Sequence, residues 1–364
     1  MKQITVELGE RSYPIYIGEG ILDRIGEFFA ERSINKHSPI LIITDENLAA
    51  QHLDNVTHNL KHAGYNVIVK IVPPGERSKS LAVLEDVIGA ALHGGLDRQS
   101  TIVALGGGVV GDLAGFVAAS YMRGVRFVQI ATTIQAHDSS VGGKVGVNHP
   151  FAKNIIGAFH QPELVIFDIA TLRTLPDREI RSGLSEVLKE GLIWDAEFVA
   201  WCDQNTDNLL EMNSDALQHA IYEGIRIKAN VVSLDEREND LRAILNLGHT
   251  IGHALEAVSG YNELLHGEAI SIGMVGAAKL AIRLGSPESI YIETKRLLSN
   301  LGLPTRLPEH LDIEEIMSAM MHDKKFKEGQ MVFVIPIAIG SVEVRKGVPA
   351  ELVREVVIEL KREV

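Results

Sequence analysis

The chain has 364 residues, 46% hydrophobic and 23% charged, which is typical of globular proteins with about two domains. Its formal net charge of −13 disfavours nucleic acid or an anionic membrane as a partner. A small anionic substrate remains compatible, because screening limits each charge to about 8–10 Å and a local basic pocket can outweigh the total. A single cysteine excludes an intramolecular disulfide framework. Residues 1–20 lack the pattern of a secretory signal, and no apolar stretch reaches the ~18 residues of a membrane span, so we expect a cytoplasmic protein.

In the first half of the chain, short apolar runs alternate with helical patterns. We expect strands at residues 39–44, 66–72, 101–105, 126–131 and 164–167. Helices are expected at residues 81–93 and from residue 109 onward. Strands that alternate with helices indicate a parallel sheet with helices on both faces.

The pattern changes near residue 177, where long helical stretches replace the strand signals. Helices are expected at residues 178–193, 195–210, 214–234, 250–259, 268–284 and 287–301, and later strands at residues 331–335 and 341–345. We therefore predict a Rossmann-like α/β domain at residues 1–176 and a helical domain at residues 177–364. Ligands of open α/β sheets bind beyond the carboxyl ends of the strands, so we expect the active site between the two domains.

A glycine-rich turn follows one of the expected strands. Gly106, Gly108 and Gly111 satisfy the spacing G-x-G-x-x-G, in which glycine lets the backbone approach a pyrophosphate at a helix N-terminus. Tight strand-to-helix turns also use glycine for steric reasons alone, and the acidic residue usual about 20 positions later is missing. Three polar residues that follow other strand ends are candidates for the cofactor's hydroxyl groups: Asp45, Glu76 and Lys79. The sequence thus indicates a nucleotide site in a variant layout.

Histidines and a carboxylate in the second half suggest a metal site. His249 and His253 are spaced i and i+4 on one helical face, and His266 opens a later helix. Glu186 lies one helical turn before Lys189. Such ligands suit zinc, and three protein ligands leave a coordination position open for substrate. With 14 histidines in the chain, a chance H-x-x-x-H pair is the competing explanation.

Basic side chains stand at turns or beside glycines in this acidic chain. They are Arg123, Lys144, Lys153, Arg242, Lys324 and Lys325, with the polar residues Asp138, Asn154 and Asn246 nearby. Each alone is more often solvated than ligand-bound. Together they suit a substrate that carries a phosphate and a carboxylate. We expect Arg242 and Asn246 on the same helix side as His249.

These segments, in this order, resemble the dehydroquinate synthase family. The resemblance runs from residues 44–47 to residues 323–325, and its most specific segments are residues 106–116, 138–144, 153–162, 245–253 and 265–269. It implies an N-terminal domain that binds NAD and a C-terminal helical domain that holds one divalent metal, Zn²⁺ or else Co²⁺. It also implies a homodimer in which Arg123 reaches into the partner's site.

Carried over residue by residue, the resemblance implies three sets of ligands. The metal ligands are Glu186, His249 and His266. The cofactor-binding residues are Asp45, Asn47, Gly75, Glu76, Lys79, Gly106, Gly107, Gly108, Val109, Val110, Gly111, Asp112, Thr132, Thr133, Lys144, Lys153, Thr171, Leu172, Arg173 and Thr174. The catalytic residues are Asp138, Lys144, Lys189, Arg242, Asn246 and His253, and the other substrate-binding residues are Arg123, Lys153, Asn154, Lys324 and Lys325.

The implied reaction turns 3-deoxy-D-arabino-heptulosonate 7-phosphate into 3-dehydroquinate and phosphate, in the shikimate pathway to aromatic amino acids. Oxidation of a ring hydroxyl by NAD gives a ketone that acidifies the neighbouring C–H, so phosphate can leave, and its own oxygen can take the proton. Re-reduction restores NAD, and ring opening and an aldol closure follow. The metal polarises the oxygen being oxidised, and the protein mainly orients the reactants.

Two positions depart from the family's pattern. His137 stands where the family usually has an apolar residue, and Glu190 where it has an aromatic residue or histidine. An extra carboxylate beside Lys189 would shift its pKa or pair with it. These departures favour altered substrate preference or metal affinity but leave the ligands themselves unchanged.

Three alternative functions compete with this interpretation. A related sugar phosphate cyclase would make an inosose or valiolone-type ring, but the pair Lys324 and Lys325 with Arg242 and Asn246 favours a substrate that carries a carboxylate. A metal-dependent polyol dehydrogenase would release NADH and would not need so many anion-binding groups. A non-enzymatic NAD-binding or scaffold protein would leave the clustered histidines unexplained.

Overall fold

The computed structural model describes residues 1–260, 263–321 and 331–362. It divides the chain into two compact units. The first unit comprises Met1–Leu175 and Leu217–Arg237, and the second comprises Pro176–Ala216 and Glu238–Val364. The predicted ranges differ from this division at residues 217–237, which they place in the second domain, and at Pro176, which they place in the first. Among the described residues, no helix combines the length and the apolar character that a membrane span requires.

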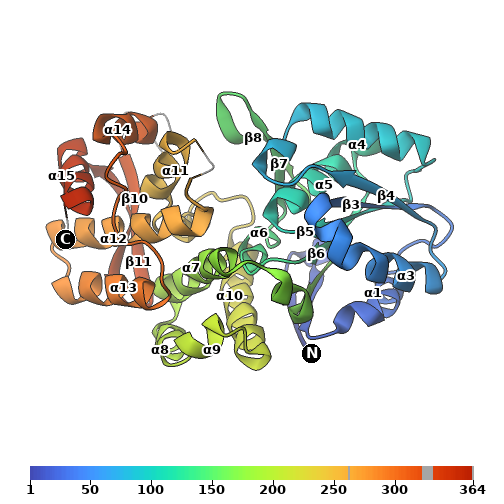
Figure 1. The fold of residues 1–364 in the computed structure, drawn as a ribbon, viewed down its shortest axis with the longest axis horizontal. Helices are drawn as coiled ribbons and strands as arrows, with labels where there is room; N and C mark the ends of the chain where they lie inside the picture. Colours follow the sequence, from blue (N-terminus) through green and yellow to red (C-terminus); the bar gives the residue numbers. More distant parts are fainter. Residues whose placement is uncertain (261–262, 322–330, 363–364) are drawn as a thin grey trace. The chain divides into compact units, whose positions relative to one another are not determined.

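The first unit is built on a seven-stranded sheet (Figure 1). In spatial order its strands are β1 (Lys2–Val6), β2 (Tyr13–Gly18), β9 (Leu164–Asp168), β6 (Arg126–Ala131), β5 (Thr101–Gly106), β3 (Ile40–Asp45) and β4 (Val67–Val72). Neighbouring strands run parallel from β2 to β4, and β1 pairs antiparallel with β2. The predicted strands and their parallel arrangement are confirmed. The hairpin β1–β2 forms one edge of the sheet and is absent from the predicted strands.

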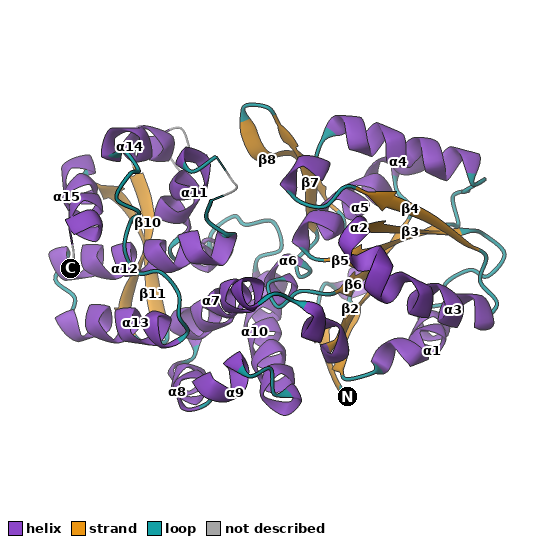
Figure 2. Ribbon diagram, viewed as in Figure 1, coloured by secondary structure: helices purple, strands orange, loops and turns teal. Residues whose placement is uncertain are grey.

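Helices cover both faces of this sheet, as predicted (Figure 2). They include α4 (Leu81–His93) and α5 (Gly108–Ser120) on one face and α1 (Ile25–Glu31) and α3 (Asp54–His62) on the other. Successive residues of a strand point to opposite faces. Accordingly, Leu41 and Ile43 pack in one apolar core, whereas Ile40 and Ile42 pack in the other. The continuous apolar run of β3 is typical of a strand buried on both faces.

A small hairpin follows the sheet strand β6. It consists of β7 (Lys144–His149) and β8 (Ala152–Phe159), and the short helix α6 (Ala136–Ser139) precedes it. We had read this segment only as a glycine-rich stretch without helical period. Val145 and Val147 anchor the hairpin in the core that also contains α5, so it is a fixed part of the first unit.

Helix α10 (Ser214–Leu234) explains why the first unit includes a late segment of the chain. The backbone N–H of Glu7 donates to Ser233 Oγ at 3.1 Å, and the ammonium of Lys2 lies over the ring of Tyr222. Helical periodicity predicts such a helix but does not identify the core against which it packs. A prediction with one boundary therefore could not assign residues 217–237 to the first unit.

The described residues of the second unit form helices and one hairpin. Its helices are α7 (Asp177–Trp194), α8 (Ala196–Gln204), α9 (Thr206–Leu210), α11 (His249–Val258), α12 (His266–Arg283), α13 (Glu288–Asn300), α14 (Ile313–Met321) and α15 (Ala350–Arg362). The hairpin pairs β10 (Met331–Ala338) with β11 (Ser341–Val348), where we predicted the later strands. The helix expected at residues 195–210 is interrupted at Asn205, which separates α8 from α9.

Helix α12 packs against both α7 and α11 at glycines. A Cβ atom on Gly267 would lie 1.9 Å from the carbonyl oxygen of Ser182 in α7. A Cβ on Gly273 would lie equally close, 1.9 Å, to the carbonyl oxygen of Gly248. Only glycine permits these approaches, and they bring the starts of α11 and α12 close to the middle of α7.

Candidate metal centre and nucleotide site

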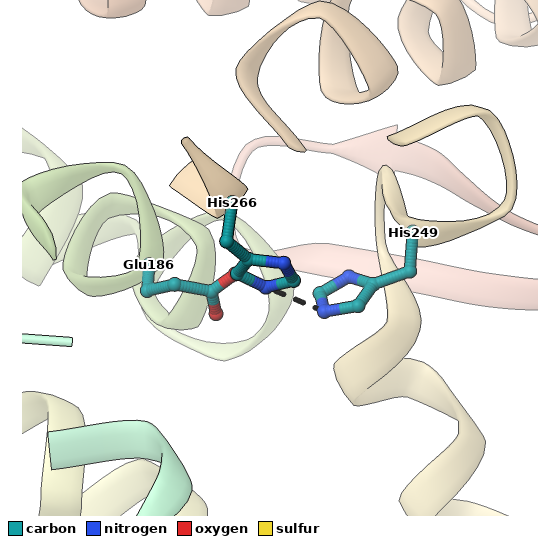
Figure 3. Close-up of side chains that lie close together, drawn as sticks. All are labelled: Glu186, His249 and His266. Carbon is teal, nitrogen blue, oxygen red and sulfur yellow. Dashed lines mark ion pairs between the residues drawn. The ribbon is translucent and has the colours of Figure 1, made fainter. Parts of the chain in front are cut away.

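Three side chains of the second unit converge on one point (Figure 3). Glu186 extends from α7, while His249 and His266 are the first residues of α11 and α12. Glu186 Oε1 lies 3.4 Å from His266 Nε2 and 3.8 Å from His249 Nε2. One ligand atom of each residue lies within 4.8 Å of the others. These are the three predicted metal ligands, and the structure brings them together.

A glycine places His249 at the start of its helix. Gly248 has φ +78, a left-handed conformation, and a Cβ there would lie 2.8 Å from the carbonyl oxygen of Ile270. The chain therefore breaks between the 3-10 helix Leu241–Asn246 and α11. Our expectation that Arg242 and Asn246 share a helix side with His249 is wrong, because this left-handed turn separates the two helices.

The outer nitrogens of both histidines have acceptor partners. His249 Nδ1 lies 3.0 Å from the carbonyl oxygen of Leu247, and His266 Nδ1 lies 3.2 Å from Glu256 Oε2. A carbonyl only accepts, so Nδ1 of His249 donates to it, and Nε2 is the ring nitrogen that faces Glu186. Metal-binding histidines are usually held in this way. The donor set thus fits a divalent cation such as Zn²⁺.

The electrostatics of this cluster favour positive charge. Burial lowers the pKa of His266, but the carboxylates of Glu256 and Glu186 outweigh it and raise the pKa to about 10. The ring therefore lies in a field that stabilises a cation, whether a proton or a metal. On the other side, Lys189 Nζ lies 2.5 Å from Glu186 Oε2.

Among the other predicted residues of the second unit, His253 lies beside this centre. The ring of His253 lies 5.1 Å from that of His249 and 6.0 Å from that of His266, between ring centroids. Arg242 is buried, and Asn246 Nδ2 donates to Glu238 Oε1 at 2.9 Å. Lys324 and Lys325 lie outside the described residues.

In the first unit, the predicted nucleotide residues lie where the strand order reverses. β3 is followed in sequence by β4 on one side, whereas β5 pairs with β3 on the other. Thr44 and Leu105 are register partners, so Asp45 and Gly106 end adjacent strands. Ligands of doubly wound sheets bind at such a switch point, and α5 begins there with backbone N–H groups that lack intrahelical acceptors.

The glycines of this turn have packing reasons of their own. A Cβ on Gly106 would lie 2.4 Å from Val110, and one on Gly107 would lie 2.7 Å from Thr133. A Cβ on Gly111 would lie 2.4 Å from the amide of Gln129. Steric packing therefore accounts for Gly106, Gly107 and Gly111. The support for a nucleotide site comes from the switch point and the helix N-terminus.

Lys79 connects predicted cofactor-binding and substrate-binding residues. Its Nζ lies 2.7 Å from Asp112 Oδ2 and 2.5 Å from Asn154 Oδ1. Burial lowers the pKa of Lys79, but the carboxylates of Asp112 and Glu76 outweigh it and raise the pKa above its usual value. Lys79 is therefore a charged lysine that holds the start of α5 to the hairpin β7–β8.

Asn148 is a second connector, which sequence reasoning missed. Its Nδ2 donates to Glu76 Oε1 at 2.8 Å, and its Oδ1 accepts from the backbone N–H of Asn154 at 2.8 Å. Lys153 Nζ lies 4.0 Å from the same Glu76 oxygen. No spacing rule singles out an asparagine in a short hairpin, so only the fold identifies it.

The side chains of other predicted cofactor-binding residues contact neighbouring residues of the chain. In the 3-10 helix Ile169–Thr174, Thr171 Oγ1 donates to the carbonyl oxygen of Asp168 at 2.8 Å. Leu172 is buried, and Arg173 pairs with Glu19. Thr174 Oγ1 donates to the carbonyl oxygen of Thr171 at 2.8 Å and lies 3.0 Å from His52 Nε2. Their backbone lies near the end of β9, and the side chains contact other residues of the chain, at the surface in the case of Arg173 and Thr174.

The remaining predicted cofactor-binding residues flank the strand ends. Gly75 has φ +87 before the 3-10 helix Glu76–Ser78, and Asn47 is exposed in the short helix α2 (Glu46–Leu48). Thr132 is buried directly after β6. Gly108, Val109 and Val110 form the first turn of α5.

Asp138 has a lysine partner that the sequence did not reveal. Lys228 Nζ of α10 lies 2.8 Å from Asp138 Oδ1 and also donates to the Asp138 carbonyl oxygen. The only available signal was a lysine between the apolar residues Ile227 and Ala229 in a helix. His137, one of the two departures from the family's pattern, is fully buried. Its ring packs against Gly224 of α10, where a Cβ atom would lie 2.8 Å from His137 Cδ2.

The predicted cationic residues Lys144 and Arg123 lie on different elements of the first unit. Lys144 opens β7 after the left-handed glycines Gly142 and Gly143. Arg123 follows the C-terminal end of α5, has φ +69 and is exposed. A helix of 13 residues is about 20 Å long. Within this chain, Arg123 is therefore far from the glycine turn at the other end of α5.

Comparisons with known proteins agree with this geometry. The chain matches the family models described as 3-dehydroquinate synthase N-terminal, over residues 69–182, and C-terminal, over residues 183–326. A 3-dehydroquinate synthase of Desulforamulus reducens is 50% identical over 350 residues, which are 96% of this chain and 97% of the relative.

Solved structures of related cyclases share the fold. A 2-deoxy-scyllo-inosose synthase complexed with carbaglucose-6-phosphate, NAD⁺ and Co²⁺ is 27% identical with a TM-score of 0.88, over 98% of this chain and 99% of that one. A 2-epi-5-epi-valiolone synthase of Streptomyces hygroscopicus subsp. jinggangensis with NAD⁺ and Zn²⁺ bound is 25% identical with a TM-score of 0.87, over 97% and 98%.

Proposed function

Since the chain belongs to the 3-dehydroquinate synthase family, we propose that it is a phosphate-eliminating cyclase dependent on NAD and a divalent metal. It converts 3-deoxy-D-arabino-heptulosonate 7-phosphate into 3-dehydroquinate and inorganic phosphate. The observation that carries this proposal is the convergence of Glu186, His249 and His266, because a dinucleotide-binding fold alone would not require it.

The metal is held by one oxygen and two nitrogens. Glu186 Oε1 and the Nε2 atoms of His249 and His266 are the donors, and Leu247 and Glu256 orient the two rings. Zn²⁺ is our first choice, and Co²⁺ suits the same ligands. When bound, NAD exchanges a hydride with the substrate and the metal polarises a substrate hydroxyl.

The first unit supplies the cofactor site. The N–H groups at the start of α5 bind the pyrophosphate, since a helix N-terminus favours anions. Asp45, beside that turn, accepts from a ribose hydroxyl. Lys79 keeps Asp112 and Asn154 in place, so one lysine orients a residue that binds the cofactor and a residue that binds the substrate.

Cationic side chains bind the substrate's two anionic groups. Lys144, Lys153, Lys189 and Arg242 are donors to its phosphate and carboxylate. The pair Asp138–Lys228 extends this set. These groups bind and orient the substrate, and phosphate can itself remove the neighbouring proton, so no separate strong base is needed.

We further propose a homodimer, in which Arg123 completes the partner's substrate site. Its distance from the glycine turn, along the full length of α5, supports a role outside its own site. Three consecutive residues at this turn, Met122, Arg123 and Gly124, have positive φ. Left-handed backbone at non-glycine residues is strained and clusters at functional sites.

Phosphate release tests the proposed function directly. Purified protein with Zn²⁺ and substoichiometric NAD should release one inorganic phosphate per substrate and accumulate no NADH. Stoichiometric NADH from polyols without phosphate release would instead indicate a dehydrogenase. Turnover of a sugar phosphate that lacks a carboxylate, in preference to the proposed substrate, would indicate an inosose or valiolone-type cyclase. The 50% identity to a 3-dehydroquinate synthase, against 25–27% to those cyclases, favours the first outcome.

A further inference from the structure

Three ionisable side chains share a buried face of α7. Glu186, Lys189 and Glu190 are spaced i, i+3 and i+4, and at most 1% of each side chain is exposed. Lys189 Nζ lies 2.5 Å from Glu186 Oε2 and 3.4 Å from Glu190 Oε1. The ammonium group is therefore shared between two carboxylates, of which only Glu186 also faces the histidines.

The two oxygens of Glu186 have different neighbours. Oε1 faces the Nε2 atoms of His249 and His266, whereas Oε2 contacts Lys189. An ammonium on a carboxylate reduces the attraction of that carboxylate for a second cation. A buried ammonium also needs a carboxylate partner, since an unpaired buried charge costs several kcal/mol.

We propose that Glu190 is a positioning residue that strengthens the metal site by offering Lys189 a second carboxylate partner, so that the ammonium competes less with a metal for Glu186. This inference rests on the proposed metal-dependent function. With Glu190 present, Lys189 keeps a carboxylate partner when the carboxylate of Glu186 binds the metal. The carboxylate of Glu190 also lies within 4.8 Å of that of Glu186, and a second carboxylate beside a metal site attracts a divalent cation. Both effects have the same sign, so removing the charge of Glu190 must weaken metal binding.

The affinity of metal-free protein for Zn²⁺, measured by competition with a chromophoric chelator, tests this inference without recourse to activity. We expect Glu190→Gln to weaken Zn²⁺ binding 10- to 100-fold, on the scale of residues that orient metal ligands. Lys189→Met should strengthen binding, because it removes the competing ammonium. In the Lys189→Met background, Glu190→Gln should cost a smaller factor, because there is no longer an ammonium to divert.

Two outcomes would overturn the proposal: an unchanged affinity in Glu190→Gln, or an equal loss in both backgrounds, which would reduce Glu190 to a distant charge. If the glutamine variant fails to fold, Glu190→Asp retains the charge but shortens its reach to Lys189, and an affinity equal to wild type would reject the proposal. The control is Glu197→Gln, which changes an exposed carboxylate of α8 and should leave the affinity unchanged. A wild-type protein that binds no stoichiometric Zn²⁺ would defeat the proposed function and this inference together, whereas normal Zn²⁺ binding with a neutral Glu190→Gln defeats only the inference.

Discussion

Nδ1 of His266 lies 3.2 Å from Oε2 of Glu256, so a buried carboxylate holds the ring whose other nitrogen faces Glu186. We predict that Glu256→Gln weakens Zn²⁺ binding 10- to 100-fold, because the ring loses its orienting charge. Titration of metal-free protein against a competing chelator measures this. A matched control is Glu263→Gln, which removes a carboxylate paired with an exposed histidine, His310, at 3.0 Å. Equal affinities in both variants would show that Glu256 does not support the metal site.

The crossing of α7 and α12 should tolerate no side chain at Gly267. A Cβ there would lie 1.9 Å from the carbonyl oxygen of Ser182, and such overpacking costs about 1–3 kcal/mol or more. We predict that Gly267→Ala lowers the melting temperature and also weakens Zn²⁺ binding, because it displaces His266. Gly89→Ala is the contrasting variant, since nothing lies within 4 Å of its Cβ in α4. It should stabilise the protein by about 0.5–1 kcal/mol. A Gly267→Ala protein as stable as wild type would contradict this close packing.

The sequence predicted the elements whose pattern is local. Apolar runs such as residues 39–44 appear as sheet strands, because a strand buried on both faces needs them. The glycines beside His249 and His266 favoured the two histidines as ligands, and the family resemblance implied the set with Glu186. Both glycines prove to be required by close helix contacts. Their assignment as metal ligands remains a prediction.

Features that depend on long-range packing could not be predicted. Lys228 meets Asp138 only because α10 returns to the first unit, and helical periodicity contains no information on that return. Glycines within residues 142–157 interrupt the alternation that would have indicated the hairpin β7–β8. A single left-handed residue, Gly248, separates Arg242 from the helix of His249. Helical periodicity does not reveal such a break, so the prediction placed both residues on one helix.

The sole cysteine should report on unfolding. Burial raises the pKa of the Cys202 thiol to about 12, with a smaller contribution from Asp203, against about 8.5 for an exposed thiol. Because the folded-state pKa is raised, its stabilising effect is complete below pH ~8.5 and is lost as the pH rises toward 12. We predict no reaction with a thiol-specific chromogenic disulfide at pH 8 in the folded protein, and one thiol per chain in denaturant. Cys202→Ser is the blank. Rapid labelling of folded protein would mean that this helix opens readily.

Lys144 should affect rate without affecting stability. It is exposed at the first position of β7, so its removal leaves no cavity in the core. We predict that Lys144→Ala lowers kcat/KM by about 10²-fold or more, as expected for losing an electrostatic contact to the reacting groups, while the melting temperature changes by no more than about 1–2 °C. Lys61→Ala, another exposed lysine of the first unit, should match wild type in both. A Lys144→Ala rate within twofold of wild type would exclude it from the site.

A subunit-mixing experiment can test whether Arg123 acts across a dimer interface. Arg123→Ala and Glu186→Gln should each be inactive alone, the first for lack of a substrate contact and the second for lack of a metal ligand. In a mixed dimer, the Arg123→Ala subunit keeps its metal site and receives Arg123 from its partner, so one of two sites is intact. Random exchange makes half of the dimers mixed, and we predict recovery of about a quarter of wild-type activity. The control mixture combines Glu186→Gln with His249→Ala, which lie on one metal site and should restore nothing. If the first mixture also stays inactive while mass analysis confirms mixed dimers, Arg123 serves its own subunit or none.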